Sequence, residues 1–165
     1  MLKETADKLG VSNISDLKDK APTLKFSGTP ECPQRPDCLL GLKDTYGLKF
    51  KKVIPVDPAL RYSVLEKKKA DVGIVFTTDG QLAQGKVKLL EDDMHMFPPY
   101  NVTLVFKKDA LDKLGPDARK TIALVQQGLT TEAMQELNSR VDIDKQTPAA
   151  VAKAYTDSGT SIKAA

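Results

Sequence analysis

The sequence lacks any apolar run that approaches the roughly 20 residues needed to span a bilayer. Its first residues, Met1-Leu2-Lys3-Glu4, also lack the apolar core of a signal peptide. We therefore expect a soluble chain that carries no signal peptide of its own. At 165 residues, 41% of them hydrophobic, the chain is long enough for one domain with a proper core.

Charge of one sign is not concentrated anywhere in the chain. The 25 basic and 22 acidic residues are spread along its whole length, so there is no basic stripe of the kind that binds nucleic acid. The longest like-charged run, Lys67 to Lys69, fits the exposed end of a helix, where cations meet the negative end of the helix dipole. We expect no nucleic-acid partner.

Residues suited to catalysis or cofactor binding are scarce. The single histidine, His95, has no evident nucleophile partner, no carboxylate pair has a spacing that suggests acid–base work, and Gly-rich phosphate motifs are absent. Asp92 and Asp93 are adjacent, and adjacent carboxylates point in different directions in an extended loop, so a hard-cation site is not expected there. The sequence therefore predicts a binding protein rather than an enzyme, with no cofactor and no metal.

Only two cysteines are present, and they lie six residues apart in Cys32-Pro-Gln-Arg-Pro-Asp-Cys38. The two prolines restrict the intervening chain to extended or turn conformations that would bring the thiols together, so we predict a disulfide. Two buried free thiols and a half-formed metal site are the alternatives, although zinc would need about four Cys or His ligands and only His95 remains. A disulfide would place the protein in an oxidising compartment.

Short β-rich segments alternate with helical patterns, which predicts an α/β domain with a layered, largely parallel sheet flanked by helices. The predicted strands are Thr23–Ser27, Lys51–Pro55, Asp71–Phe76, Lys88–Leu90 and Asn101–Phe106. The predicted helices are Glu4–Leu9, a short one from Ser15, Leu39–Tyr46, Leu60–Lys69, a short one up to Ala83, and three more that start at Pro116, near Ala133 and at Pro148. Because Asp71–Phe76 is a nearly continuous apolar run, we expect it to be central and buried on both faces. The last residues, Thr160–Ala165, are typical of a frayed tail.

Open α/β sheets bind ligands beyond the carboxyl ends of their strands, so the loops that follow the strands are the candidate sites. In the first loop, Gly28–Cys38, a disulfide would hold Arg35 at the tip with its guanidinium fork available to a carboxylate. The alternative is an exposed arginine that pairs with Glu31 or Asp37.

Two further loops carry aromatic and polar side chains. The loop Phe76–Gly80 contains an aromatic ring, the hydroxyls of Thr77 and Thr78, and the free backbone amides at the start of a helix. Its alternative is a core phenylalanine followed by a cap at Asp79. The proline-stiffened loop 92–100 would present Tyr100, for which a purely structural tyrosine is the alternative.

Six short blocks follow one another along the chain. They are Ser-Asp-Leu at 15–17, Pro-Glu-Cys-Pro-x-Arg-Pro at 30–36, Gly-Leu-Lys-x-x-Tyr-Gly-Leu-Lys-Phe at 41–50, Thr-Asp-Gly at 78–80, Leu-Glu-Asp-Asp at 90–93 and Pro-Pro-Tyr-Asn at 98–101. In this order they resemble the osmoprotectant-binding family, the glycine betaine, choline and carnitine type of substrate-binding protein of ABC importers. Glu-Leu-Asn at 136–138, followed by Val141-Asp142, resembles the C-terminal segment of that family.

The resemblance implies a periplasmic-binding-protein-like fold of type II. In this fold two α/β lobes close on a quaternary ammonium solute, which aromatic rings hold through cation–π attraction while polar groups fix its carboxylate. By resemblance Arg35 matches a carboxylate-binding arginine, Tyr100 is a ring of the aromatic box, and Phe76 stands where a tyrosine is usual. Thr77 and Thr78 would line the same wall. The missing hydroxyl at Phe76 suggests a different or less polar ligand than glycine betaine.

Much of the family's first lobe has no counterpart in this chain. We therefore expect residues 1–106 to form the α/β ligand-binding lobe and residues 107–165 a helical segment that would normally pack on the first lobe. An uncovered apolar face on that segment would favour association, and a homodimer, with or without a domain swap, is our hypothesis. The expected function is solute binding for an ABC importer and its permease, in the periplasm or outside the cell. The alternative is an isolated or engineered structural lobe that self-associates and has no ligand.

Overall fold

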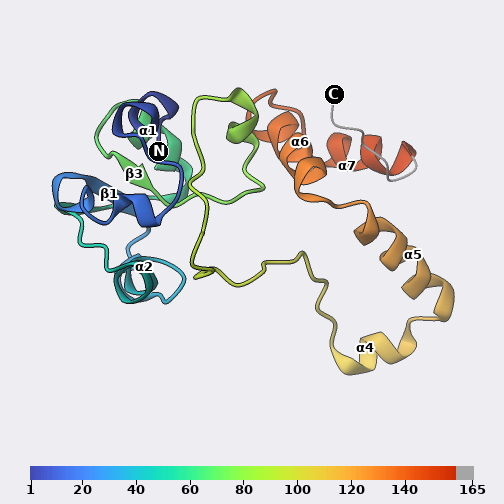
Figure 1. Ribbon diagram of the computed structural model, residues 1–165. Coiled ribbons are helices and arrows are strands. Elements are labelled where there is room, and N and C mark those ends of the chain that lie inside the picture. Colours follow the sequence, from blue (N-terminus) through green and yellow to red (C-terminus); the bar gives the residue numbers. More distant parts are fainter. Residues whose placement is uncertain (159–165) are drawn as a thin grey trace. The chain divides into compact units, whose positions relative to one another are not determined.

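The computed structural model describes residues 1–158 and divides them into two compact units (Figure 1). Unit 1 consists of Met1–Phe76 and Gln84–Pro99, and unit 2 of Thr77–Ala83 and residues 100–158. The frayed tail predicted at Thr160–Ala165 lies outside the described residues. Within residues 1–158, no helix combines the length and the apolar character that crossing a membrane requires.

Unit 1 is built on a three-stranded parallel sheet in the order β2-β1-β3. Its strands are β1 (Lys25–Gly28), β2 (Lys52–Pro55) and β3 (Val72–Gly73), and its α-helices are α1 (Lys3–Leu9), α2 (Leu39–Tyr46) and α3 (Arg61–Glu66). Helix α2 connects β1 to β2 and α3 connects β2 to β3, so two successive βαβ crossovers form the unit. The predicted α/β class with a parallel sheet is confirmed.

Strand β1 is the central strand, whereas Asp71–Phe76 was expected in that place. Only Val72 and Gly73 of the apolar run pair with β1, and the side chain of Phe76 is 54% exposed. The prediction that this run is central and buried on both faces is therefore wrong. An apolar run reports a tendency to be buried and carries no information about how many neighbours a strand has.

Two predicted strands do not form in the described part of the chain. Around Lys88–Leu90 there are only isolated bridges, one between Leu2 and Val87 and one between Asn13 and Glu91. Residues 101–106 have extended or irregular backbone without a ladder, and most of their apolar side chains are more than half exposed. The alternating pattern of 101–106 is typical of a strand, but a β-strand forms only when its backbone hydrogen-bonds to a neighbouring strand.

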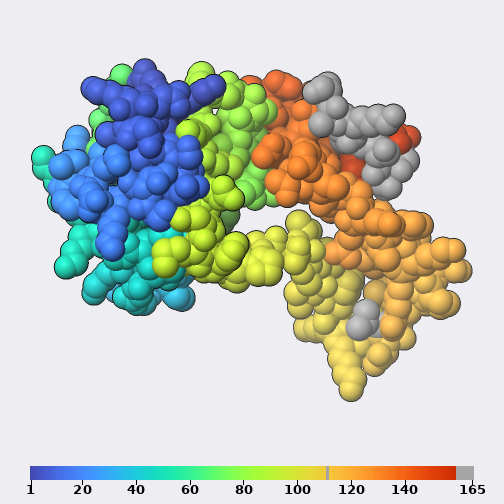
Figure 2. Space-filling model, viewed as in Figure 1, coloured from blue at the N-terminus to red at the C-terminus, as the bar shows by residue number. Residues whose placement is uncertain are grey.

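The two faces of the sheet are covered by different helices. Phe26 of β1 is 2% exposed and belongs to a buried cluster with Leu42 and Tyr46 of α2. The next residue, Ser27, points to the opposite face, where Leu65 of α3 is fully buried close to Gly73. Figure 2 shows the blue and teal segments of this unit side by side at the surface of the molecule.

The helix ends in unit 1 follow the sequence closely. Helix α1 ends at Gly10 and α2 at Gly47, and both glycines have the left-handed backbone that terminates helices, with φ of 65° and 68°. The α2 bounds are those predicted, Leu39–Tyr46. The predicted helix at Ser15 is a single turn of 3₁₀ helix over Ser15–Leu17.

Unit 2 is helical. Its α-helices are α4 (Lys108–Lys113), α5 (Pro116–Gln127), α6 (Thr131–Asp142) and α7 (Pro148–Asp157). The hydroxyls of Thr130 and Thr147 cap α6 and α7 by accepting the N–H groups of Ala133 and Ala150, at 3.2 Å each. Burial in this unit is confined to a few side chains, among them Ala133, Val151 and Tyr155.

Candidate functional site

Three loops of unit 1 leave the same edge of the sheet. Because β1, β2 and β3 are parallel, their carboxyl ends at Gly28, Pro55 and Gly73 lie along one edge, where ligands of open α/β sheets bind. The first loop carries Arg35 and the third carries Phe76, both predicted from the sequence. The second loop leads into Arg61, which the sequence analysis did not single out.

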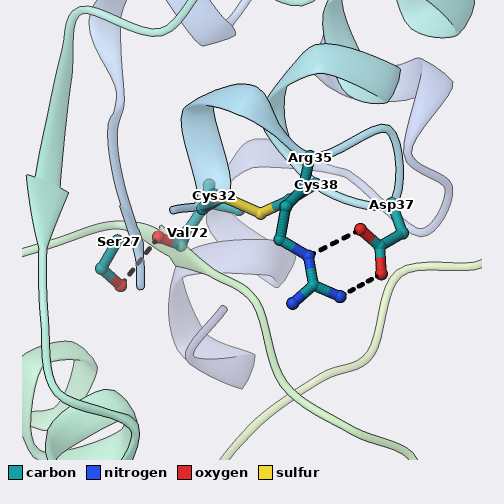
Figure 3. The surroundings of a disulfide bond; sticks show 6 residues. All are labelled: Ser27, Cys32, Arg35, Asp37, Cys38 and Val72. Atoms are coloured by element: carbon teal, nitrogen blue, oxygen red, sulfur yellow. Dashed lines mark hydrogen bonds and ion pairs between the residues drawn. A yellow bond between two sulfur atoms is a disulfide. The ribbon is translucent and has the colours of Figure 1, made fainter. Parts of the chain in front are cut away.

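The first loop is fixed by the predicted disulfide between Cys32 and Cys38, whose Cα atoms are 5.3 Å apart (Figure 3). Both cysteines are buried. A Cβ atom at Gly41 of α2 would overlap the carbonyl oxygen of Pro36, so the helix packs directly on the backbone of this loop. The disulfide prediction is confirmed. The loop is fixed by this covalent bond and by the close packing of α2 on its backbone.

Arg35 projects from this loop and makes a two-pronged ion pair with Asp37 (Figure 3). Its Nε donates to one carboxylate oxygen at 2.8 Å and its Nη2 to the other at 2.5 Å, which is the fork geometry of a strong arginine–carboxylate pair. The guanidinium side chain is 50% exposed. This is the local pairing raised as the alternative, and a solute carboxylate at Arg35 would have to share the guanidinium with Asp37.

Phe76 lies beside a cation from the second loop. The guanidinium carbon of Arg61 is 5.0 Å from the centroid of the Phe76 ring. Arg61 is the first residue of α3, and its Nε donates to the carbonyl oxygen of Pro58 at 2.9 Å. The turn below it is capped by the Asp57 carboxylate, which accepts the N–H of Ala59 at 2.8 Å. The ring and the cation are thus presented together by adjacent loops.

In unit 2, the backbone of Thr77 and Thr78 is held by helix α6. The side-chain amide of Gln135 donates to the carbonyl of Thr77 at 2.5 Å, and that of Asn138 donates to the carbonyl of Thr78 at 2.7 Å. Gly80 lies so close to α6 that a Cβ atom there would be 2.6 Å from the Cα of Ser139. These bonds engage the carbonyls and leave the threonine side chains to other partners.

The contact explains two sequence blocks that were noted separately. Thr-Asp-Gly at 78–80 and Glu-Leu-Asn at 136–138 meet through Asn138, which bonds the first block from within the second. Sequence reasoning missed Gln135 and Asn138 as supports of the turn. Both blocks contributed to the same family resemblance, and this was the one sequence signal that linked them. It did not indicate that the two blocks are in contact.

A further segment of unit 1, residues 92–97, is organised by the partly buried carboxylate of Asp92. Asp92 accepts the Tyr46 hydroxyl, the N–H of Met96 at 2.9 Å and the N–H of Phe97 at 2.7 Å. Burial raises the pKa of Asp92, but these hydrogen bonds outweigh it and hold the pKa below its usual range. Burial and the bond to Asp92 raise the pKa of Tyr46, whose hydroxyl also accepts the N–H of Met94 at 2.8 Å. This network sets the path of the chain towards Pro99.

The five predicted ligand residues fall into two groups. Arg35 and Phe76 belong to unit 1, and Thr77, Thr78 and Tyr100 belong to unit 2. Tyr100 is 64% exposed.

An apolar pocket in unit 1 is a poor match for a charged solute. Its lining is dominated by side chains of the core, such as Phe26, Leu42 and Phe97, and it includes neither Arg35 nor Phe76. The lining includes one basic side chain, Lys88, and no acidic one, so the ammonium group of a zwitterion would lose its hydration there without meeting an opposite charge. The candidate site therefore remains the loop edge of the sheet.

Comparison with known proteins adds independent evidence. Residues 1–158 match the family described as the substrate binding domain of the ABC-type glycine betaine transport system. Among solved structures, a glycine betaine/carnitine/choline ABC transporter protein is similar with a TM-score of 0.79 and 32% identity, over 96% of this chain and 58% of that one.

Two relatives from bacteria are similar in sequence. A glycine-betaine-binding protein of Pseudomonas aeruginosa is 34% identical over 163 residues, which cover 92% of this chain and 52% of the relative. An ergothioneine transport permease/ergothioneine binding protein of Helicobacter pylori is 32% identical over 155 residues, 94% of this chain and 28% of the relative. The chain thus spans at most about half the length of these relatives.

Proposed function

The chain belongs to the family of substrate-binding domains of ABC-type glycine betaine transport systems, and we propose on this premise that it is a solute-binding component of an ABC importer. The observation that carries the proposal is the family match over residues 1–158, joined to a loop edge that presents a ring and two arginines. The relatives are named as binding and transport proteins, so we infer binding rather than catalysis.

The solute class that fits is a small quaternary ammonium or related zwitterion. The ring of Phe76 in unit 1 and that of Tyr100 in unit 2 are each more than half exposed, and each by itself would offer an electron-rich face to a methylated ammonium group. Arg35 would take the carboxylate by exchanging one oxygen of Asp37 for one of the solute, and the hydroxyls of Thr77 and Thr78 would serve the polar part. The names of the relatives span glycine betaine, carnitine and ergothioneine, which supports the class and leaves the individual solute to experiment.

An importer needs a membrane permease, and we propose one as the partner of the protein to which this chain belongs. One relative joins a permease and a binding protein in a single name, which supports this pairing. We also propose a location outside the cytoplasm, in the periplasm or at the cell exterior. The Cys32–Cys38 disulfide supports it, because such bonds persist in oxidising compartments.

Replacing Phe76 with leucine is expected to weaken binding of choline or glycine betaine, because leucine keeps apolar bulk but has no ring face. The loss should be about 0.5 to 2 kcal/mol of binding free energy. NMR titration of the full chain measures it, and Phe76→Tyr, which keeps a ring, is the matched control and should bind at least as well as the original chain. Equal affinities of all three chains would contradict the role of Phe76.

A second candidate is a lobe that self-associates without a ligand, and one observation favours it. Large apolar side chains are exposed along residues 102–106 and on α5, among them Val105 at 90% and Leu124 at 52%. Exposed apolar patches favour association, so we expect a concentration-dependent homodimer. Sedimentation equilibrium should show the apparent mass rising towards twice 18.0 kDa, and a strictly monomeric chain at high concentration would rule this candidate out.

A further inference from the structure

The ring proposed to hold the solute already faces a cation of the chain itself. The Arg61 guanidinium lies 5.0 Å from the centroid of the Phe76 ring, inside the distance of about 6 Å at which cations are attracted to ring faces. A quaternary ammonium group is attracted by the same quadrupole and would need the same ring. Two positive charges at one small ring also repel each other.

The position of Arg61 is set by the fold. Residues 56–61 follow β2 and residues 74–76 follow β3, so both loops leave the same edge of the sheet. The side chain of Arg61 is tied to the turn below it through the carbonyl of Pro58, and Asp57 caps that turn. The guanidinium is therefore held at the ring by its own loop, and the contact does not depend on a solute.

We propose that Arg61 is a specificity-determining residue of this site. Its guanidinium competes with a solute ammonium group for Phe76 and so disfavours solutes that carry only a positive charge. A zwitterion is disfavoured less, because its carboxylate can lie near the guanidinium while its ammonium group meets the ring. The inference rests on the proposed function, since it treats Phe76 as a ring that contacts the solute.

The test compares the full chain with Arg61→Gln, which removes the charge and retains a donor, and Arg61→Lys, which retains the charge. Each is titrated with choline, with glycine betaine, and with 3,3-dimethylbutan-1-ol, the uncharged carbon isostere of choline. Arg61→Gln is expected to raise the affinity for choline about twofold to thirtyfold, the range that one cation–π contact commands. Glycine betaine and the uncharged alcohol should gain less, and Arg61→Lys should remain a weak binder of choline.

A ligand-free readout tests the contact itself. The side-chain NMR signals of Arg61 lie in the ring current of Phe76, so Phe76→Leu should move them to positions ordinary for arginine. Signals that stay in place, or a choline affinity that Arg61→Gln leaves unchanged or lowers, would overturn the inference. If the chain binds glycine betaine but Arg61→Gln does not change the preference between solutes, the inference alone fails. If none of the folded chains binds any of the three compounds, the proposed function fails and the inference fails with it.

Discussion

Replacing Gly80 with alanine is expected to lower the stability of unit 2 by about 3 kcal/mol, because the new methyl group has no room. A Cβ atom at this position would overlap the backbone nitrogen of Ser139 and lie 2.6 Å from its Cα and 2.7 Å from the carbonyl carbon of Asn138. These are backbone atoms of α6, which cannot move aside as a side-chain tip can. The helix and the turn must separate.

Separation would also break both amide anchors of the turn. The bonds from Gln135 to Thr77 and from Asn138 to Thr78 are 2.5 and 2.7 Å long, and neither survives a shift of the helix by an ångström. Amide hydrogen exchange of α6 in the full chain measures the effect, which should appear as faster exchange throughout the helix. On the proposed solute-binding role of Thr77 and Thr78, solute affinity is expected to fall as well, because both residues lose their fixed backbone.

A matched glycine in the same unit separates steric conflict from the general effect of adding a methyl group. A Cβ atom at Gly115, which precedes α5, would have nothing within 4 Å, so Gly115→Ala should change exchange in α6 little. If Gly80→Ala and Gly115→Ala behave alike, the close packing of the turn on α6 is not what stabilises unit 2.

Those parts of the fold that rest on local chemistry could be predicted from the sequence. The α2 bounds follow from a helical pattern closed by Gly47, and the disulfide follows from two cysteines around a proline-stiffened turn. The parallel sheet follows from alternating strand and helix patterns. Each of these depends on residues close together in the chain, where propensities and spacing are informative.

Features that rest on distant partners could not be predicted in the same way. Whether Asp71–Phe76 is central depends on which strands lie on each side of it, and β1 has that place instead. Residues 101–106 have the right alternation for a strand, but within the described residues they have no ladder partner. Arg61 could have been predicted as a site residue, because it follows the predicted strand Lys51–Pro55, whose loop was not among the candidate sites.

The role of the Asp92 carboxylate also depends on a residue that is distant in the sequence. Asp92 and Asp93 were considered only as cation ligands, because the sequence shows two adjacent acids and does not show what donates to them. In the structure Asp92 accepts from Tyr46, which is 46 residues away, and from two amides of its own loop. The adjacent Asp93 accepts the N–H of Ser15 at 3.2 Å, and hydrogen bonding to the Ser15 side chain, with a smaller part from this N–H, lowers the pKa of Asp93.

Replacing Asp92 with asparagine is expected to lower the stability of unit 1 by about 2 kcal/mol at neutral pH, since hydrogen bonds to a charged group are worth more than neutral ones. The NH₂ group of the asparagine side chain is a donor, so it cannot accept the hydrogen bond that the carboxylate oxygen at its position accepts. Denaturant unfolding, followed by exchange of the Met96 and Phe97 amides, measures the loss. Asp44→Asn, which changes an exposed carboxylate on α2, is the matched control and should stay within about 0.5 kcal/mol.

The pH dependence of this loss gives a sharper test than its size. The folded-state pKa of Asp92 is lowered, so the stability it contributes is fully present above the ordinary aspartate pKa of about 4 and is lost as the pH falls through the lower folded-state value. The difference between the original chain and Asp92→Asn should therefore shrink below pH 4. Tyr46→Phe removes one donor of the same network, so its cost and that of Asp92→Asn should not add. A difference that is constant from pH 7 to acid, or fully additive costs, would show that the carboxylate is not the centre of this loop.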